Sequence, residues 1–342
     1  MAPSLENAVI NHSNADSEIT SDDMIKVTRH FHPSVWKGYD FNLASTDFID
    51  EERRQELKKE VKSMLSLVAN DSFEELDLID KIQRLGVAYH FEDEIEDILQ
   101  RTYNEDYCQF FDQNGLNNEN SDLCYVSLRF RLLRQAGFYV SPVVFKKFKV
   151  EKKSEFHANL VSDVQGMLSL YEASYLGFHG EDIMDDAMAF TNKHLKSMLT
   201  SLSTSLRLQV QHSLTMPPQR SVERIIARNY ISVYQQDMSR NKVLLEFAKL
   251  DYNAVQLLHR KEISEVQSWW ERMNVRSKLQ YDVRDRVVEA YAITNNIYFE
   301  PQFSQGRIHL GKLWSILTVL DDSYDVYGNL EELGPLCDAF QR

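Results

Sequence analysis

Residues 310–328 read LGKLWSILTVLDDSYDVYG, a long apolar stretch that ends in three carboxylates within five residues. Its leucines are separated by steps of three, four and three residues, the spacing of one helix face: Leu310, Leu313, Leu317 and Leu320. Asp321 follows Leu317 by four residues, and Asp325 follows Asp321 by four. At roughly 100° per residue, Asp321 and Asp325 are expected at the edge of the buried face, while Asp322 points more to the side.

Two carboxylates one turn apart that face an interior would repel each other, and each is costly to bury. A bound divalent cation would remove both problems. Oxygen-only ligands suit Mg²⁺, with Mn²⁺ as a possible substitute, and Mg²⁺ often shares a substrate phosphate. The alternative is a solvated acidic helix end, since D-D-x-x-D alone often occurs by chance. The position of the acids beside the apolar face favours the metal site.

A second candidate group is the run Arg284-Asp285-Arg286, which precedes a helical pattern at residues 287–291. Asp282 can cap this helix, which leaves both arginines in its first turn or in the preceding loop. Basic side chains there oppose the helix dipole. Guanidinium groups bind diphosphate oxygens well, so diphosphate binding would explain why two arginines occur at this position. Surface pairing with neighbouring acids is the alternative.

Composition restricts the class of protein. The chain has 342 residues, which suggests about two domains, and its 43% hydrophobic and 26% charged content is typical of a globular protein. The net charge of −14 argues against nucleic acid as a partner, although not against a diphosphate accompanied by metal ions. Cys108, Cys124 and Cys337 are widely spaced, which is typical of buried or free thiols in a reducing compartment.

The N-terminal residues 1–24 are polar and acidic, and we expect a flexible leader. A secretory signal needs an apolar core and a transit peptide avoids acids, so a cytoplasmic location is predicted. No run of about 18 apolar residues is found, which argues against a membrane span.

Helical periodicity predominates along the chain, and alternating strand patterns are nearly absent, so the predicted fold class is all-α. Helices are expected at residues 51–67, 76–91, 127–134, 244–258 and 263–273. Residues 114–121 are rich in Gly and Asn and are expected to form a turn, and the acidic cluster at residues 181–186 is interpreted as a helix start. Packing as in α-barrels is expected.

Several stretches of the chain resemble plant terpene synthases, from about residue 25 to residue 342. They are FHPSVW at residues 31–36, which resembles that family's N-terminal strap, the run at 76–91, ARNYISVYQ at 227–235, and residues 299–303 and 315–322 before the aspartates. The resemblance implies a complete N-terminal helical domain of the α-barrel type at residues 25–225. An incomplete class I metal-binding α-barrel at residues 226–342 follows it.

The same resemblance assigns roles to the two candidate groups. Asp321 and Asp325 would hold magnesium ions that bind an allylic diphosphate, with Asp322 less directly involved. Arg284 lies 37 residues before Asp321, close to the offset of the family's R-x-R motif, so Arg284 and Arg286 would steer the departed diphosphate away from the carbocation. A monomer is expected for the full-length family.

The chain departs from the family pattern at three places. Lys26 and Val27 stand where many relatives have an Arg-Arg or Arg-Pro pair, which disfavours monoterpene-type cyclisation. Ala292 and Ile293 replace an aromatic pair, and a Trp face would stabilise a nearby cation by roughly 1–2 kcal/mol. The family's second metal motif is not found among the 17 residues after Asp325.

We therefore expect a plant sesquiterpene synthase, a carbon–oxygen lyase that converts farnesyl diphosphate to a hydrocarbon, present as a fragment or truncated form. We expect this chain to be inactive alone, because the second metal motif is missing. Two alternatives remain: a non-catalytic helical protein, and a prenyltransferase that couples two isoprenoid diphosphates. The product is expected to depend on the shape of the apolar wall.

Overall fold

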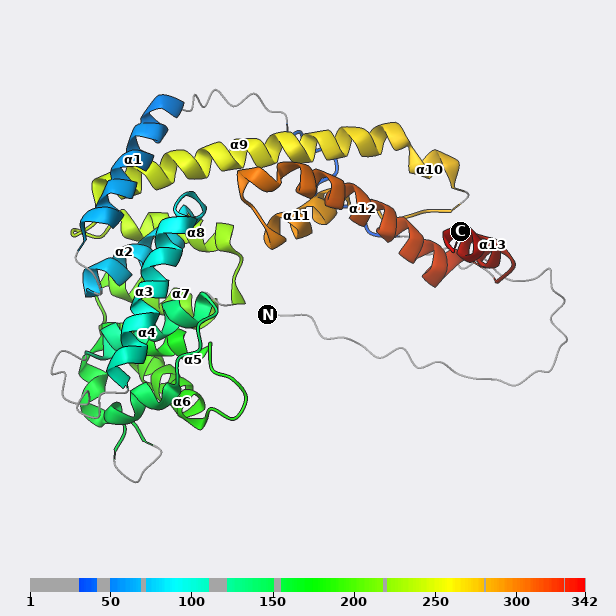
Figure 1. The fold of residues 1–342 in the computed structure, drawn as a ribbon. Helices are drawn as coiled ribbons and strands as arrows, with labels where there is room; N and C mark the ends of the chain where they lie inside the picture. Colours follow the sequence, from blue (N-terminus) through cyan, green and yellow to red (C-terminus); the bar gives the residue numbers. More distant parts are fainter. Residues whose placement is uncertain are drawn as a thin grey trace, which may run out of the picture.

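The computed structural model describes residues 31–41, 50–68, 72–110, 122–150, 155–217, 220–279, 281–328 and 330–341, without the side chains of residues 105–110, 205, 330 and 332. Every regular element in these ranges is a helix, which confirms the all-α prediction (Figure 1). The leader, Lys26, Val27, the turn at residues 114–121 and the Cys108 side chain lie outside the described residues. Cys124 and Cys337 are free thiols.

The first part of the chain forms a bundle of helices. Its α-helices are α1 (Glu51–Leu67), α2 (Phe73–Arg84), α3 (Glu92–Phe110), α4 (Leu123–Gln135), α5 (Val164–Ser174), α6 (Asp182–Met198), α7 (Thr204–Thr215) and α8 (Glu223–Tyr234). Short 3₁₀ helices join them: η1 (Ala88–His90), η3 (Pro142–Phe148), η4 (Ala158–Ser162) and η5 (Leu199–Ser201). The predicted helix at residues 76–91 is interrupted because Gly86 adopts a φ of +74°, which ends α2.

The remaining elements extend away from this bundle. They are α9 (Lys242–Met273), α10 (Val275–Lys278), α11 (Val287–Ile297), η7 (Pro301–Phe303), α12 (Ser304–Asp322), the π-helix η8 (Ser323–Tyr327) and α13 (Leu330–Phe340). Two helices were expected where α9 lies, and that expectation was wrong. The residues between them contain no Pro or Gly, so nothing interrupts the backbone hydrogen bonds.

Polar residues begin several of these helices. Asp50 accepts a hydrogen bond from the backbone N–H of Arg53 at the start of α1. Ser72 and Asn241 do the same at the starts of α2 and α9. Each side chain satisfies one of the backbone donors that a helix leaves unpaired at its N-terminus, which explains why the helices begin there.

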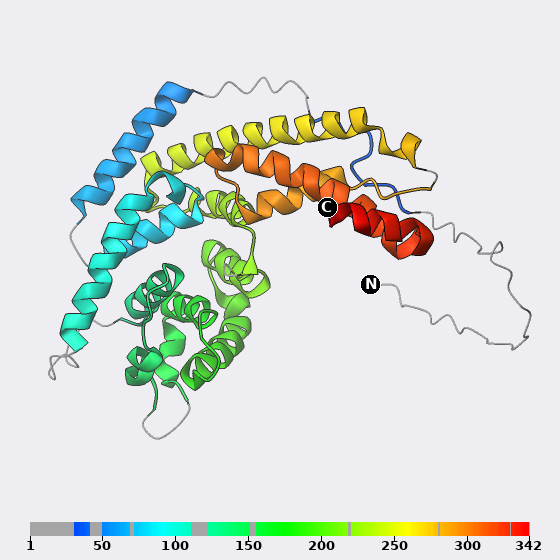
Figure 2. The ribbon, with the colours of Figure 1, turned by 45° about the vertical axis from the view of Figure 1, so that its right-hand side comes forward.

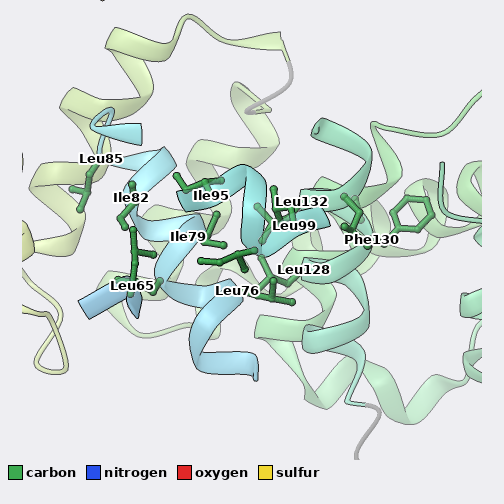
Figure 3. Packing of buried hydrophobic residues seen from close by; sticks show 14 of the residues in the cluster. Leu65, Leu76, Ile79, Ile82, Leu85, Ile95, Leu99, Leu128, Phe130 and Leu132 are labelled. Carbon is green, nitrogen blue, oxygen red and sulfur yellow. The ribbon is translucent and has the colours of Figure 1, made fainter. Parts of the chain in front are cut away.

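A large apolar core holds the bundle together. It contains buried residues from α1 to α6, such as Leu65, Ile79 and Leu99, several of which Figure 3 shows at close range. A smaller cluster beside it includes Met167 and Tyr171 from α5. Burying this much apolar surface is the main source of stability of a helical domain.

A separate core lies under the second half of α9. It is formed by Ile263, Val266, Val287, Val288, Tyr291 and Ile308 from α9, α11 and α12. The first half of α9 instead contributes Leu244 and Phe247 to the large core. Both views show α9 running from the bundle to a position over α11 and α12 (Figures 1 and 2). The domains at residues 25–225 and 226–342 stay a prediction, and the two cores share α9.

The buried face of α12 differs from the expected one. Arg307, Ile308, Gly311, Ser315 and Asp322 are buried, whereas the side chains of Leu313 and Leu317 are 49% and 40% exposed. A β-carbon at Gly311 would lie 3.5 Å from the Cα of Tyr291, so α11 and α12 approach closely at this glycine. Small residues permit that approach and leucines do not, which explains why Leu313 and Leu317 face outward.

Candidate functional site

Arg284 is brought together with two of the predicted aspartates. Its backbone N–H donates to Oδ2 of Asp322 at 2.7 Å, and its Nε donates to Oδ1 of the same carboxylate at 2.5 Å. A terminal guanidinium N–H of Arg284 donates to Asp321. The loop that carries Arg284 is held in place by Val283, which is buried. The end of α12 and the loop before α11 therefore form one charged cluster.

The two neighbouring aspartates have different environments. The side chain of Asp322 is 1% exposed, and that of Asp321 is 57% exposed. This reverses the expected geometry, in which Asp321 borders the buried face and Asp322 points aside. The reason is the packing of α12: Asp322 follows Gly311 and Ser315 by helical spacing and so lies on the face that contacts α11.

The α-helix does not continue to Asp325. It ends at Asp322 and changes to a π-helix at Ser323, with the N–H of Gly328 donating to the carbonyl of Ser323 at 2.7 Å. Asp325 is exposed on this π turn. The prediction of one continuous α-helix through Asp321 and Asp325 was therefore wrong, because the turn widens between them.

Tyr281 fixes the π turn to the arginine loop. Its hydroxyl shares a hydrogen bond of 2.6 Å with Ser323, and its ring stacks on Tyr327 with ring centroids 4.6 Å apart. Ser323 in turn donates to the carbonyl of Val319 at 2.7 Å. We did not identify this tyrosine from the sequence, since no local pattern shows which loop a turn contacts.

Arg286 contacts a different part of the chain. Its guanidinium donates to the carbonyls of Asp285 at 2.9 Å and of His32 at 2.7 Å. Arg286 is also the N-cap residue of α11, but its side chain makes no capping hydrogen bond to the first turn of the helix. The expected cap by Asp282 is therefore wrong; Asp282 lies 3.7 Å from Arg276 instead.

The strap at residues 31–41 lies against this loop and α11. Ser34 donates to Glu289 at 2.9 Å, and the Arg284 guanidinium lies 5.6 Å from the centre of the Phe31 ring. Phe41 packs against the second core. The strap thus contacts both arginines, across more than 250 residues of sequence.

The neighbouring carboxylates favour the protonated, positively charged form of Arg284. Partial burial of the Arg284 guanidinium lowers its pKa, but the hydrogen bonds to Asp321 and Asp322 outweigh this, and the pKa lies above its usual value. Arg284 therefore stays protonated throughout the physiological range. It provides one fixed positive charge next to the carboxylates of Asp321 and Asp322.

The oxygen donors of the cluster fit a metal ion only in part. Within the described ranges, no three His, Cys, Asp or Glu side chains form a group that could hold a metal. Asp321 and Asp325 are exposed carboxylates, whereas both oxygens of Asp322 accept from Arg284. Oxygen donors fit Mg²⁺, which retains water and substrate ligands. Asp321 and Asp325 can therefore supply part of a magnesium site.

An apolar surface adjoins the charged cluster. The outward face of α12 carries large side chains with 38–49% exposure: Leu313, Trp314, Ile316 and Leu317. Leu313, Leu317 and Asp321 follow one another at intervals of four residues, so the face leads to the exposed carboxylate. Ile293 on α11 is 44% exposed. Charged and apolar surfaces side by side can accommodate a molecule with an anionic head and a hydrocarbon tail.

None of the helices in the described ranges is both long and apolar enough to cross a bilayer.

Comparison with known proteins gives consistent results. The family model for the N-terminal domain of terpene synthases matches residues 26–214, and the model for the metal-binding domain of that family matches residues 271–342. A (+)-delta-cadinene synthase isozyme of Gossypium arboreum is 45% identical over 322 residues, which are 94% of this chain and 56% of the relative. A sesquiterpene synthase of Cananga odorata is 45% identical over 318 residues, 92% of this chain and 54% of the relative.

A solved structure is similar as well. It is isoprene synthase from leaves of grey poplar (Populus x canescens), in complex with three Mg²⁺ ions and dimethylallyl-S-thiolodiphosphate. The TM-score is 0.75 and the identity 36%, over 85% of this chain and 54% of that one. The chain spans a little over half the length of the curated relatives that it matches.

Proposed function

The chain belongs to the terpene synthase family. From this premise we propose that it is the N-terminal part of a sesquiterpene synthase, an enzyme that converts farnesyl diphosphate to a hydrocarbon. The observation that carries the proposal is Arg284, held between Asp321 and Asp322 next to the apolar outward face of α12. The similarity to a sesquiterpene synthase over 92% of the chain supports farnesyl diphosphate as the substrate. Geranyl diphosphate is the competing substrate to test.

Asp321 and Asp325 would hold Mg²⁺, or Mn²⁺ in its place, and the metal would supply positive charge for the departing diphosphate. Arg284 and Arg286 would bind diphosphate oxygens with their guanidinium groups and keep the anion away from the carbocation. The apolar side chains of α12 would exclude water from the cation. Asp322 would act less directly, by fixing Arg284.

Four further features of the protein belong to the proposal. The 342-residue chain tested alone is inactive, because Asp321 and Asp325 supply only part of a metal cluster and the outward face of α12 is open to water. A monomer and a cytoplasmic location are proposed for the full-length enzyme. The acidic balance of the chain, with a net charge of −14, supports the absence of a nucleic-acid partner.

Radiolabelled farnesyl diphosphate tests the proposal. Residues 1–342 are assayed alone and as a chimera joined to the remaining C-terminal part of the Gossypium relative, each with Mg²⁺. The chimera is expected to release a volatile hydrocarbon, and the chain alone none. The matched control is the chimera with Asp321→Asn, which should lose most of its turnover. A longer diphosphate would instead identify a prenyltransferase. A folded chimera without turnover would indicate a non-catalytic protein.

A further inference from the structure

We infer that Arg284 is an internal cation that occupies Asp321 until a metal ion displaces it, and that displacement frees its guanidinium for an anionic ligand. The inference rests on the proposed function, because it concerns the same site. It also gives Asp322 a distinct role, since this carboxylate is a positioning group that keeps Arg284 at the site in both states.

The two sides of the Arg284 contact differ in burial. The backbone N–H and Nε of Arg284 both bind Asp322, whose side chain is 1% exposed. The terminal N–H binds Asp321, whose side chain is 57% exposed. Contacts to a buried carboxylate are costly to break, whereas an exposed ion pair contributes little. The contact with Asp321 is therefore the replaceable one.

Asp321 cannot serve Arg284 and a divalent ion equally well. A metal needs an oxygen of this carboxylate, and a guanidinium bound to the same group repels the ion. When the metal takes Asp321, the terminal N–H of Arg284 loses its acidic partner. Its Nε stays on Asp322, so the guanidinium remains beside the metal with a donor available for a diphosphate oxygen. Binding of the metal and binding of the anion are thereby coupled.

Arg286 provides a matched control. It carries the same charge on the same loop, but its hydrogen bonds go to the carbonyls of Asp285 and His32. Replacing Arg286 changes the net charge equally and leaves the Arg284–Asp321 contact in place. A general effect of charge on metal affinity would appear equally in the Arg284 and Arg286 variants. An effect of displacing Arg284 from Asp321 would appear in the Arg284 variants alone.

The experiment measures Mn²⁺ affinity of residues 1–342 by electron paramagnetic resonance, with the metal alone and no diphosphate. Arg284→Ala and Arg284→Gln are expected to bind Mn²⁺ about three- to ten-fold tighter than the wild type, as expected from losing one partly exposed competing charge. Arg286→Ala should stay within about two-fold of the wild type. The gain should disappear in the double variant Arg284→Ala with Asp321→Asn.

Equal affinities in the Arg284 and Arg286 variants would overturn the inference, as would a gain that persists without Asp321. If the wild type binds no Mn²⁺, binding that emerges in Arg284→Ala supports the inference, and its absence there overturns it. The backbone N–H of residue 284 can bind Asp322 in every variant, and far-UV circular dichroism checks the fold. Hydrocarbon formation by the chimera is a separate readout, so failure of the proposed function and failure of displacement are distinguishable.

Discussion

Asp321 and Asp322 are neighbours in the sequence, yet they contribute differently to the molecule. Asp322 accepts two hydrogen bonds from Arg284 inside the protein, and Asp321 accepts one at the surface. A buried carboxylate that loses its charge leaves its guanidinium partner without compensation. At this scale, the two neighbouring carboxylates therefore differ: Asp322 anchors Arg284, and Asp321 is the exposed one that we propose for metal binding.

Asp322→Asn is expected to lower the free energy of unfolding by about 1–3 kcal/mol, since Arg284 is itself partly exposed and the full penalty of a buried pair does not apply. Asp321→Asn should change it by less than about 1 kcal/mol, as for an exposed pair. Urea denaturation of residues 1–342 measures both. Equal losses in the two variants would contradict the assignment of Asp322 as the anchor.

His259 gives the stability a pH dependence. Burial lowers its pKa to about 4, although the hydrogen bond to the carbonyl of Phe299 opposes the shift. The ordinary pKa is about 6.5, so the unfolded chain binds a proton between pH 6.5 and 4 that the folded chain does not. The contribution of His259 is therefore present above pH 6.5 and is lost as the pH falls toward 4.

The expected loss from this residue is about 2–3 kcal/mol between pH 6.5 and 4. His259→Gln should remove that part of the slope, so the wild type and the variant converge in stability as the pH falls. The control is His309→Gln, at an exposed histidine on α12. The measurement is the free energy of unfolding in urea at several pH values. If the free energies of unfolding of the wild type and His259→Gln change in parallel with pH, His259 is not the source of the pH dependence.

At the scale of elements, α12 has an inner face on which small and polar residues accompany Ile308, and an outer face of large apolar residues. Ile308 is 3% exposed and belongs to the second core, whereas Leu313 faces outward. We expect Ile308→Ala to lower the free energy of unfolding by about 2–4 kcal/mol. Leu313→Ala should cost less than about 1 kcal/mol. Urea denaturation distinguishes them, and the reverse order would mean that the leucine stripe is buried in solution.

The strap is the second element that tertiary contacts define. Its Ser34 contacts Glu289, and its His32 carbonyl accepts from Arg286. These bonds attach an N-terminal segment to α11 and to the loop that carries both arginines. A structural role for the strap agrees with its packing, since Phe41 adds to the second core.

For the whole molecule, α9 is the connection between two cores. Its first half packs with the bundle and its second half with α11 and α12. All four tryptophans lie outside the large core, at positions 36, 269, 270 and 314. Tryptophan fluorescence therefore reports on the second core, whereas far-UV circular dichroism reports on all helices.

Gln256→Pro should interrupt α9 between the cores at an exposed position, at a cost of about 3 kcal/mol or more. We expect the fluorescence midpoint in urea to fall further than the circular dichroism midpoint, because the second core loses its support. Gln256→Ala is the control and should leave both midpoints nearly unchanged. Midpoints that fall together in Gln256→Pro would show that the cores unfold as one unit.

The sequence by itself determined the helical fold class, the positions of several helices and the family, because these follow from local periodicity and from motifs of a few residues. It also identified Arg284, Arg286 and the three aspartates as candidates, since their chemistry is visible in their side chains. Only the tertiary structure decided which face of α12 is buried, that Asp322 rather than Asp321 is the inner carboxylate, and that the strap reaches the arginine loop. Those features depend on which helix approaches Gly311 and on contacts between residues far apart in the chain. Local spacing describes the faces of a helix, but only its packing partners determine which of them is removed from water.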